Sequence, residues 1–172
     1  YNDELGNDLG NLLNRVVSMV KRYRQGIIPR SVASGEVEQE MQHLAEETRQ
    51  RAGAALEAWE IGNALSIIWT YVRRANQYVE QSEPWKLTKQ PELAGRLDTV
   101  LATAAEATRI LAILLAPFIP GSSEKILAQL GQPAASHGDW ARRGKWGSGA
   151  LEQVRPGPVI FPRLEADVLA EV

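Results

Sequence analysis

The stretch that most constrains the fold runs from Pro91 to Leu115. Its apolar and small side chains recur every three or four residues, which is the spacing of one face of an α-helix. They are Leu93, Leu97, Val100, Leu101, Ala104, Thr108, Leu111, Leu114 and Leu115. Pro91 suits a first helical turn because its missing N–H needs no partner there. The many alanines allow close approach of other helices, so we expect this to be the most buried helix of the chain.

Four further segments have the same helical spacing, and Gly- or Pro-containing breaks separate several of them. They are residues 4–25, 36–57, 63–81 and 122–130. In the second segment the spacing places Val37 on the core face and Glu38 on the outer face with the other glutamates. Residues 59–63 are expected to form a break, and Ser122 is available to cap the last helix. The prediction is an all-α, five-helix bundle.

The C-terminal part of the chain lacks this regularity. Residues 131–158 are rich in Gly, Pro and Ser, a composition that predicts an irregular loop. The pairs Asp139-Trp140 and Lys145-Trp146 are the residues expected to pin the loop onto the bundle. The apolar run 159–161 lies between prolines and predicts a strand or a short extended arm.

Size and composition exclude several classes of protein. The 172 residues suffice for one domain with a substantial core, and we expect residues 1–130 to form the bundle and residues 131–172 to pack on it as a loop and tail. The chain has no cysteine, and His43 and His137 form no ligand pattern, so neither a disulfide nor a metal site is expected. No segment has the roughly 20 apolar residues that span a membrane. Because the first residue is Tyr1, we expect a domain cut from a longer protein.

Charge is distributed unevenly. The net charge is −2, so a nucleic acid would have to bind to a local patch. From Leu9 to Gly35 there is no acidic residue. The basic residues of this stretch are Arg15, Lys21, Arg22, Arg24 and Arg30. Such a patch would suit contacts to phosphates.

A polar stripe follows the first predicted helix. Asn7, Asn11 and Arg15 lie one turn apart on the side opposite the apolar face, and Asn14 lies near them. Asparagine is unfavourable in helix interiors because its side chain competes for backbone hydrogen bonds. An amide and a guanidinium that project side by side can read the edge of a base. The alternative interpretation is an ordinary solvated helix face.

A proline–tryptophan corner ends the third long predicted helix. Pro84 cannot donate a backbone hydrogen bond and disfavours helical geometry in the residue before it. Trp85 follows at once, with Lys86 and Lys89 beside it. An aromatic plane on a corner next to cations suits stacking on an exposed base. The alternative is that Trp85 plugs the end of the core.

With these elements placed, four motifs in order carry a resemblance that covers essentially the whole chain. They are Tyr1-Asn2 leading to Asn7-Asp8-Leu9-Gly10-Asn11-Leu12 and Arg15; Asn76-Gln77-Tyr78 leading to Pro84-Trp85; Leu114-Leu115-Ala116-Pro117-Phe118-Ile119-Pro120; and Pro158-Val159-Ile160-Phe161-Pro162-Arg163-Leu164-Glu165. The sequence resembles the C-terminal anticodon-binding bundle of methionyl-tRNA synthetase, a class I aminoacyl-tRNA synthetase, of bacterial type.

This resemblance implies recognition of the CAU anticodon of methionine tRNAs. In the family the tryptophan after the proline stacks on an anticodon base, which corresponds to Trp85. The asparagine and arginine of the first helix contact anticodon bases, which corresponds to Asn11 and Arg15, with Asn7 in support. Lys21, Arg22, Lys86 and Lys89 are the expected phosphate contacts. The implied partners are the anticodon stem-loop and the synthetase's own catalytic domain.

The chain lacks the HIGH-like and KMSKS-like signatures of class I synthetases. We therefore expect no catalytic residue and no cofactor here, with ATP and Mg used by the catalytic domain of a cytoplasmic methionine–tRNA ligase. Two other interpretations are open. One is the bundle of another class I synthetase, for leucine, isoleucine, valine or cysteine, and the other is a structural docking bundle that binds no RNA.

Overall fold

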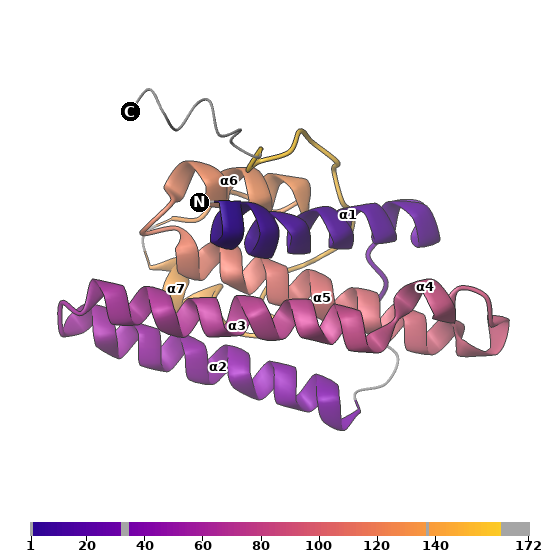
Figure 1. Cartoon of the computed structure of the whole chain (residues 1–172), viewed down its shortest axis with the longest axis horizontal. Helices are drawn as coiled ribbons and strands as arrows, with labels where there is room; N and C mark the ends of the chain where they lie inside the picture. The colour runs from indigo at the N-terminus through magenta and orange to yellow at the C-terminus, as the bar shows by residue number, and fades with distance from the viewer. Residues whose placement is uncertain (1, 32–34, 137, 163–172) are drawn as a thin grey trace.

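The computed structural model describes residues 2–31, 35–136 and 138–162 (Figure 1). Its helices are η1 (Asn2–Gly10), α1 (Asn11–Arg24), α2 (Glu36–Glu57), α3 (Ile61–Ser82), α4 (Pro84–Leu87), η2 (Pro91–Leu93), α5 (Ala94–Leu115), α6 (Pro120–Gln129) and α7 (Asp139–Arg142). The predicted all-α fold is confirmed, and the five predicted helices correspond to α1, α2, α3, α5 and α6. Tyr1, His137 and the end of the tail, 163–172, lie outside the described residues.

The helix α5 lies in the middle of the bundle. The antiparallel pair α2 and α3 covers one side of it, and α1 and α6 pack on it from the other side (Figure 1). Every side chain from Thr103 to Leu115 is buried, which confirms that this helix is the most buried one. Among the described residues no helix is long and apolar enough to cross a membrane.

The first helix begins as a π-helix rather than as the regular α-helix that the spacing predicted. Residues Asn2–Gly10 are π-helical, and the α-helical pattern starts at Asn11. Gly10, at the junction, is buried, and a methyl group there would lie 3.3 Å from the ring of Phe161. Such π segments are rare and often occur at functional sites. The apolar face is nevertheless the expected one, since Leu9, Leu12 and Leu13 are buried.

Several local predictions were wrong. Val37, expected in the core, is 41% exposed, whereas Glu38, expected outside, is buried. The predicted break at 59–63 is shorter because α3 already starts at Ile61. The N-cap of α6 is Ile119, without a side-chain cap, because Pro120 starts the helix and Ser122 lies inside its first turn.

Glu38 is buried because three donors surround its carboxylate. The Tyr78 hydroxyl and the Arg96 guanidinium each donate to it at 2.7 Å, and the Gly35 N–H donates at 3.0 Å. Burial acts to raise the pKa of Glu38, but the hydrogen bonds from Tyr78 and Arg96 outweigh it and hold the pKa below its ordinary value. Burial also raises the pKa of the Tyr78 hydroxyl, which therefore stays protonated and able to donate. This network ties the start of α2 to α3 and α5.

The C-terminal segment returns across the bundle as an extended arm, and no strand forms within the described residues. Its only regular pairing there is an antiparallel bridge between Ile27 and Gln153, flanked by hydrogen bonds from the N–H of Ile28 to Glu152 O and of Val154 to Gly26 O, each 2.8 Å. The side-chain amide of Gln129 donates to Pro158 O at 3.0 Å. At the end of the arm Phe161 lies against Gly6 and Gly10, so the arm reaches the surface of η1.

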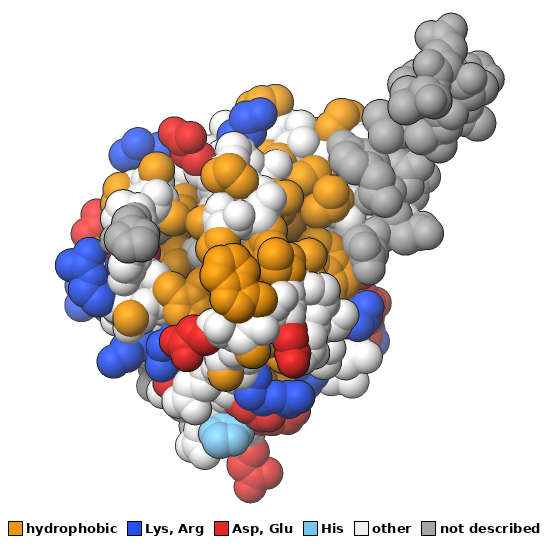
Figure 2. Space-filling model, turned by 90° about the vertical axis from the view of Figure 1, so that its left-hand side faces the viewer, with side chains coloured by type: hydrophobic (Ala, Val, Ile, Leu, Met, Phe, Trp, Pro, Cys, Tyr) orange, Lys and Arg blue, Asp and Glu red, His pale blue; other side chains and the backbone are white. Residues whose placement is uncertain are grey.

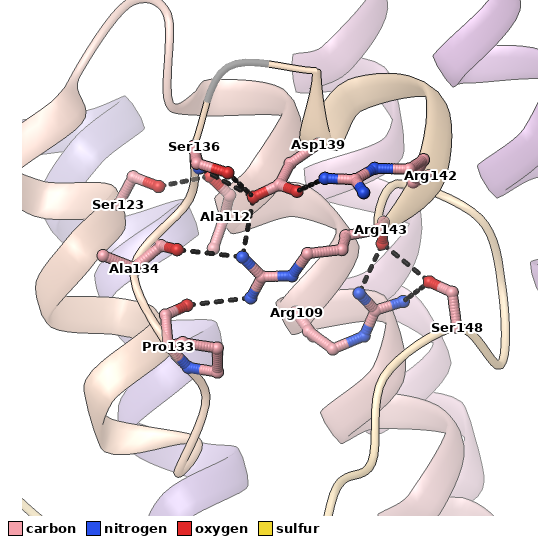
Figure 3. Close-up of polar contacts among 10 residues, drawn as sticks. All are labelled: Arg109, Ala112, Ser123, Pro133, Ala134, Ser136, Asp139, Arg142, Arg143 and Ser148. Carbon is pink, nitrogen blue, oxygen red and sulfur yellow. Dashed lines mark hydrogen bonds and ion pairs between the residues drawn. The ribbon is translucent and has the colours of Figure 1, made fainter.

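Buried charges fix the loop before the arm, as Figure 3 shows. Arg109 of α5 is fully buried and donates to both carboxylate oxygens of Glu106 at 2.7 Å and to Lys145 O at 2.8 Å. Asp139 is also buried and accepts from the N–H of Ser136 and from Arg143. The predicted pinning of the loop at positions 139–140 and 145–146 is confirmed, since the side chains of the two tryptophans, Trp140 and Trp146, pack against the core.

Candidate nucleic-acid interface

The polar stripe lies on the outer surface of η1 and α1. Asn7, Asn11 and Asn14 are exposed, and the side chain of Arg15 is 24% exposed. The helix α3 holds this segment in place, because Asn76 donates from its side-chain amide to Asp8 O at 3.0 Å. The stripe is therefore attached to the same helix that ends at the tryptophan corner.

The corner is built on an unusual backbone conformation. Glu83 ends α3 and precedes α4 with φ +43°, in the left-handed region. A residue other than glycine pays a conformational cost there, about 1–3 kcal/mol, and such residues cluster at functional sites. Pro84 is buried, which anchors the turn, and Trp85 is left half-buried beside it.

The structure brings the stripe and the corner together. The Arg15 guanidinium lies over the Trp85 ring, 5.6 Å from its centroid, and donates to the Glu80 carboxylate at 2.8 Å. A guanidinium at this distance is attracted to the face of an indole ring. The partly buried side chains of the described residues that pack against the core include Tyr23 and Leu87 but not Trp85. This position does not favour the interpretation of Trp85 as a plug of the core.

A groove lies beside the stripe on the other flank of α1. Its volume is about 400 Å³, and its lining residues are Gly6, Asn7, Asn11, Asn14, Val159 and Phe161. Within the described part of the chain, the side-chain amides of Asn11 and Asn14 form no hydrogen bond with protein groups. The sequence reasoning did not assign Asn14 or the arm to the site. Asn14 could have been found from the sequence, because asparagine is unfavourable in a helix interior. The arm could not, because its residues are far from α1 in the sequence.

The predicted basic patch is weaker than the sequence suggested. Arg24 donates to Asp98 of α5 at 2.5 Å, and Arg15 donates to Glu80 of α3 at 2.8 Å. Lys21, Arg22 and Lys89 are exposed. The acidic partners come from other parts of the chain, so a count along one helix could not include them.

No other chemistry is evident in the described residues. Among them no group of three or more His, Asp or Glu side chains could hold a metal ion. His43 lies exposed on α2. The acids with clearly lowered pKa values, such as Glu38 and Asp139, are held by hydrogen bonds from structural partners.

The all-α bundle is the fold of a helical anticodon-binding domain. A family model described as the anticodon binding domain of methionyl tRNA ligase matches residues 28–164. The chain belongs to this family. It is 37% identical to the methionine–tRNA ligase of Clostridium tetani over 171 residues, and 39% identical to methionine–tRNA ligase 1 of Bacillus anthracis over 169 residues.

These matches cover 99% and 97% of the chain but only 26% of each relative, so the chain spans about a quarter of their length. The fold also matches solved structures of Mycobacterium tuberculosis methionyl-tRNA synthetase. The apo form has a TM-score of 0.83 at 29% identity and covers 95% of this chain and 33% of that one. The form bound by methionyl-adenylate has a TM-score of 0.82 at 29% identity and covers 94% and 32%. The bundle of another class I synthetase and the docking bundle without RNA binding are not favoured.

Proposed function

We propose that this chain recognises the CAU anticodon of methionine tRNAs, as the anticodon-binding part of a methionine–tRNA ligase. The observation that carries the proposal is the Arg15 guanidinium over the ring of Trp85, one helical turn from Asn11. One surface thereby combines a stacking plane, a cation and an amide. Single-stranded bases are recognised by such combinations of stacking and base-edge hydrogen bonds.

In the proposed mechanism the anticodon loop unstacks and a base stacks on Trp85. Stacking on an aromatic side chain contributes about 1–3 kcal/mol per base. Arg15 exchanges its hydrogen bond to Glu80 for a base edge, which costs little because exposed ion pairs contribute about 1 kcal/mol or less. Asn11 supplies a donor and an acceptor at the next base, and Asn7 supports it one turn earlier. These groups provide the sequence preference.

Phosphate contacts are assigned to exposed cations on both sides of the stacking plane. Lys21 and Arg22 follow the stripe along α1, and Lys86 and Lys89 flank the corner. Their contribution carries no sequence preference and should weaken as salt rises. Lys86 contributes less than the others because Glu83 already pairs with it.

The rest of the ligase would carry out the chemistry. In this proposal the bound tRNA is oriented so that its acceptor end reaches methionyl-adenylate in the catalytic domain, which also uses ATP and magnesium. The isolated chain then binds RNA without catalysing aminoacylation, and the setting is the cytoplasm.

The test is a binding titration with a stem-loop that carries CAU and one that carries a scrambled anticodon. Trp85→Ala should weaken CAU binding about 5- to 150-fold, the equivalent of 1–3 kcal/mol. Trp59→Ala is the matched control, since Trp59 is an 86% exposed tryptophan in the turn at the opposite end of α3. Equal binding of both stem-loops, unchanged in Trp85→Ala, would refute the proposal.

A further inference from the structure

A cleft of about 910 Å³ lies between α2, α5, the segment 27–31 and the loop that precedes the arm. Pockets that bind small molecules have volumes of about 300–1,000 Å³. Figure 2 shows the end of the bundle at the α2–α3 turn, where hydrophobic side chains gather, and none of the described residues that line the cleft belongs to that turn. None of them belongs to the polar stripe or to the tryptophan corner either. The cleft is therefore a surface feature that the proposed anticodon recognition does not use.

Hydrogen bonds fix the walls of the cleft to each other and to its floor. The bridge between Ile27 and Gln153 joins the two walls. The N–H of Gly147, in the loop, donates to the carboxylate of Glu106, on α5, at 2.6 Å. Sites for small molecules are usually largely preformed, as this cleft is.

One wall of the cleft carries a half-buried tryptophan, Trp146. Its indole N–H donates to no group in the described part of the chain. The other half-buried or buried indoles differ in this respect, since Trp140 donates to Arg49 O at 3.1 Å and Trp69 donates to Asp8 at 3.3 Å. Buried indole N–H groups usually find a partner. An aromatic ring that lines a cleft with its donor unused suits a planar polar ligand.

Two further polar side chains of the lining have no partner within the described ranges. Gln42 of α2 and Arg30 are both exposed, and neither side chain forms a hydrogen bond or an ion pair there. The amide offers two donors and an acceptor, and the guanidinium offers five donors in a planar fork. The cleft thus combines an amide that can read a base edge with a cation that can bind an anionic group.

The buried acids of the lining, Glu38 and Glu106, do not select a cation. Each carboxylate already accepts three hydrogen bonds, and a paired arginine balances its charge. A carboxylate has about four acceptor sites, so each can accept from one more neutral donor, such as an amino group. The exposed charges of the lining are then one guanidinium, Arg30, and one carboxylate, Glu152. This balance disfavours a ligand with several phosphates.

We propose that the cleft binds adenosine monophosphate (AMP). The adenine stacks on Trp146, and the Gln42 amide pairs with its N6 and N7 atoms, which is the two-point arrangement by which amides read adenine. Arg30 binds the phosphate, for which the planar guanidinium is well shaped. One phosphate, rather than three, matches the single exposed cation of the lining. The inference goes beyond the proposed anticodon recognition and does not depend on it.

The first experiment titrates the 172-residue chain with AMP, with calorimetry and the indole N–H signals of NMR spectra as readouts. Binding should saturate at one AMP per chain with a Kd below about 1 mM. The Trp146 signal, identified by its absence in Trp146→Phe, should shift during the titration. The signal of Trp59, which is 86% exposed in the α2–α3 turn, should not. Absence of saturable binding up to about 10 mM AMP would overturn the proposal.

The second experiment replaces the exposed side chains of the cleft, which takes no packing away from the core. The wild-type chain should prefer AMP to GMP, and Gln42→Ala should weaken AMP binding about fivefold and remove that preference, because the amide distinguishes the two bases. Arg30→Gln should weaken AMP binding about fivefold but leave adenosine binding unchanged, because adenosine has no phosphate. The matched controls are Gln39→Ala on α2 and Arg73→Gln on α3, both exposed and outside the lining. Equal effects of the cleft variants and their controls would refute the assignment.

A third measurement separates the cleft from the proposed RNA site. A saturating amount of the CAU stem-loop should leave the Kd for AMP unchanged, because the two sites share no lining residue. Competition between the two ligands would overturn the proposal of a separate cleft. If the chain binds AMP but neither stem-loop, the anticodon proposal fails and the AMP proposal stands.

Discussion

Replacing Arg109 by methionine should strongly destabilise the bundle. The guanidinium is fully buried and donates to Glu106 and to Lys145 O. It also donates to Ser148 and to Arg143 O, as Figure 3 shows. Methionine fills a similar volume but cannot donate. Among the described residues, the Glu106 carboxylate, which is 7% exposed, would then keep only the N–H of Gly147 as a donor.

Removing one partner of a buried ion pair costs about 3–5 kcal/mol because it leaves an uncompensated charge. This loss is a large fraction of the 5–15 kcal/mol typical of a whole domain. At about 2–4 °C per kcal/mol for a chain of this length, the melting temperature should fall by about 10 °C. The assay is urea unfolding followed by circular dichroism, together with thermal unfolding. Arg142→Met is the matched control, because the Arg142 side chain is 75% exposed and should contribute about 1 kcal/mol or less.

The double variant Glu106→Gln/Arg109→Met separates charge from packing. Burying an uncharged amide costs much less free energy than burying a carboxylate, so the double variant should be more stable than Arg109→Met alone. A loss below about 1 kcal/mol in Arg109→Met would refute the reasoning, since it would place this pair among those that contribute as little as surface ion pairs do. A double variant less stable than the single one would show that packing and loop contacts dominate.

Two further predictions concern acid stability and the groove. The hydrogen bond from Arg49 lowers the pKa of Glu46 from its ordinary 4.5 to about 2, so the stability that this carboxylate contributes is complete above pH 4.5 and is lost as the pH falls through about 2. NMR titration should give Glu46 a pKa of about 2, and in Arg49→Gln this pKa should return toward 4.5. An unchanged pKa in that variant would contradict the role of the Arg49 hydrogen bond. Asn14→Ala should lower the affinity for the CAU stem-loop about fivefold without lowering the melting temperature, because alanine is the better helix former. Unchanged affinity in the titration would exclude the groove from the RNA site.

The helices could be predicted from the sequence because the signal is local. The three-and-four spacing of Pro91–Leu115 depends only on which side of one helix faces the core. The same holds for Asn11 and Arg15, whose neighbourhood follows from helical geometry alone. The tryptophan corner was likewise local, because Pro84 ends the preceding helix wherever the helix lies.

The remainder depended on contacts between segments far apart in the sequence. Glu38 has the spacing of a surface residue, and only Tyr78 and Arg96, 40 and 58 positions away, make its burial possible. Arg24 belongs to a stretch without acidic residues in the sequence, but in the fold Asp98 of α5 pairs with it. Val159 and Asn14 line the same groove because the arm returns to η1 and α1, and no periodicity encodes such a return.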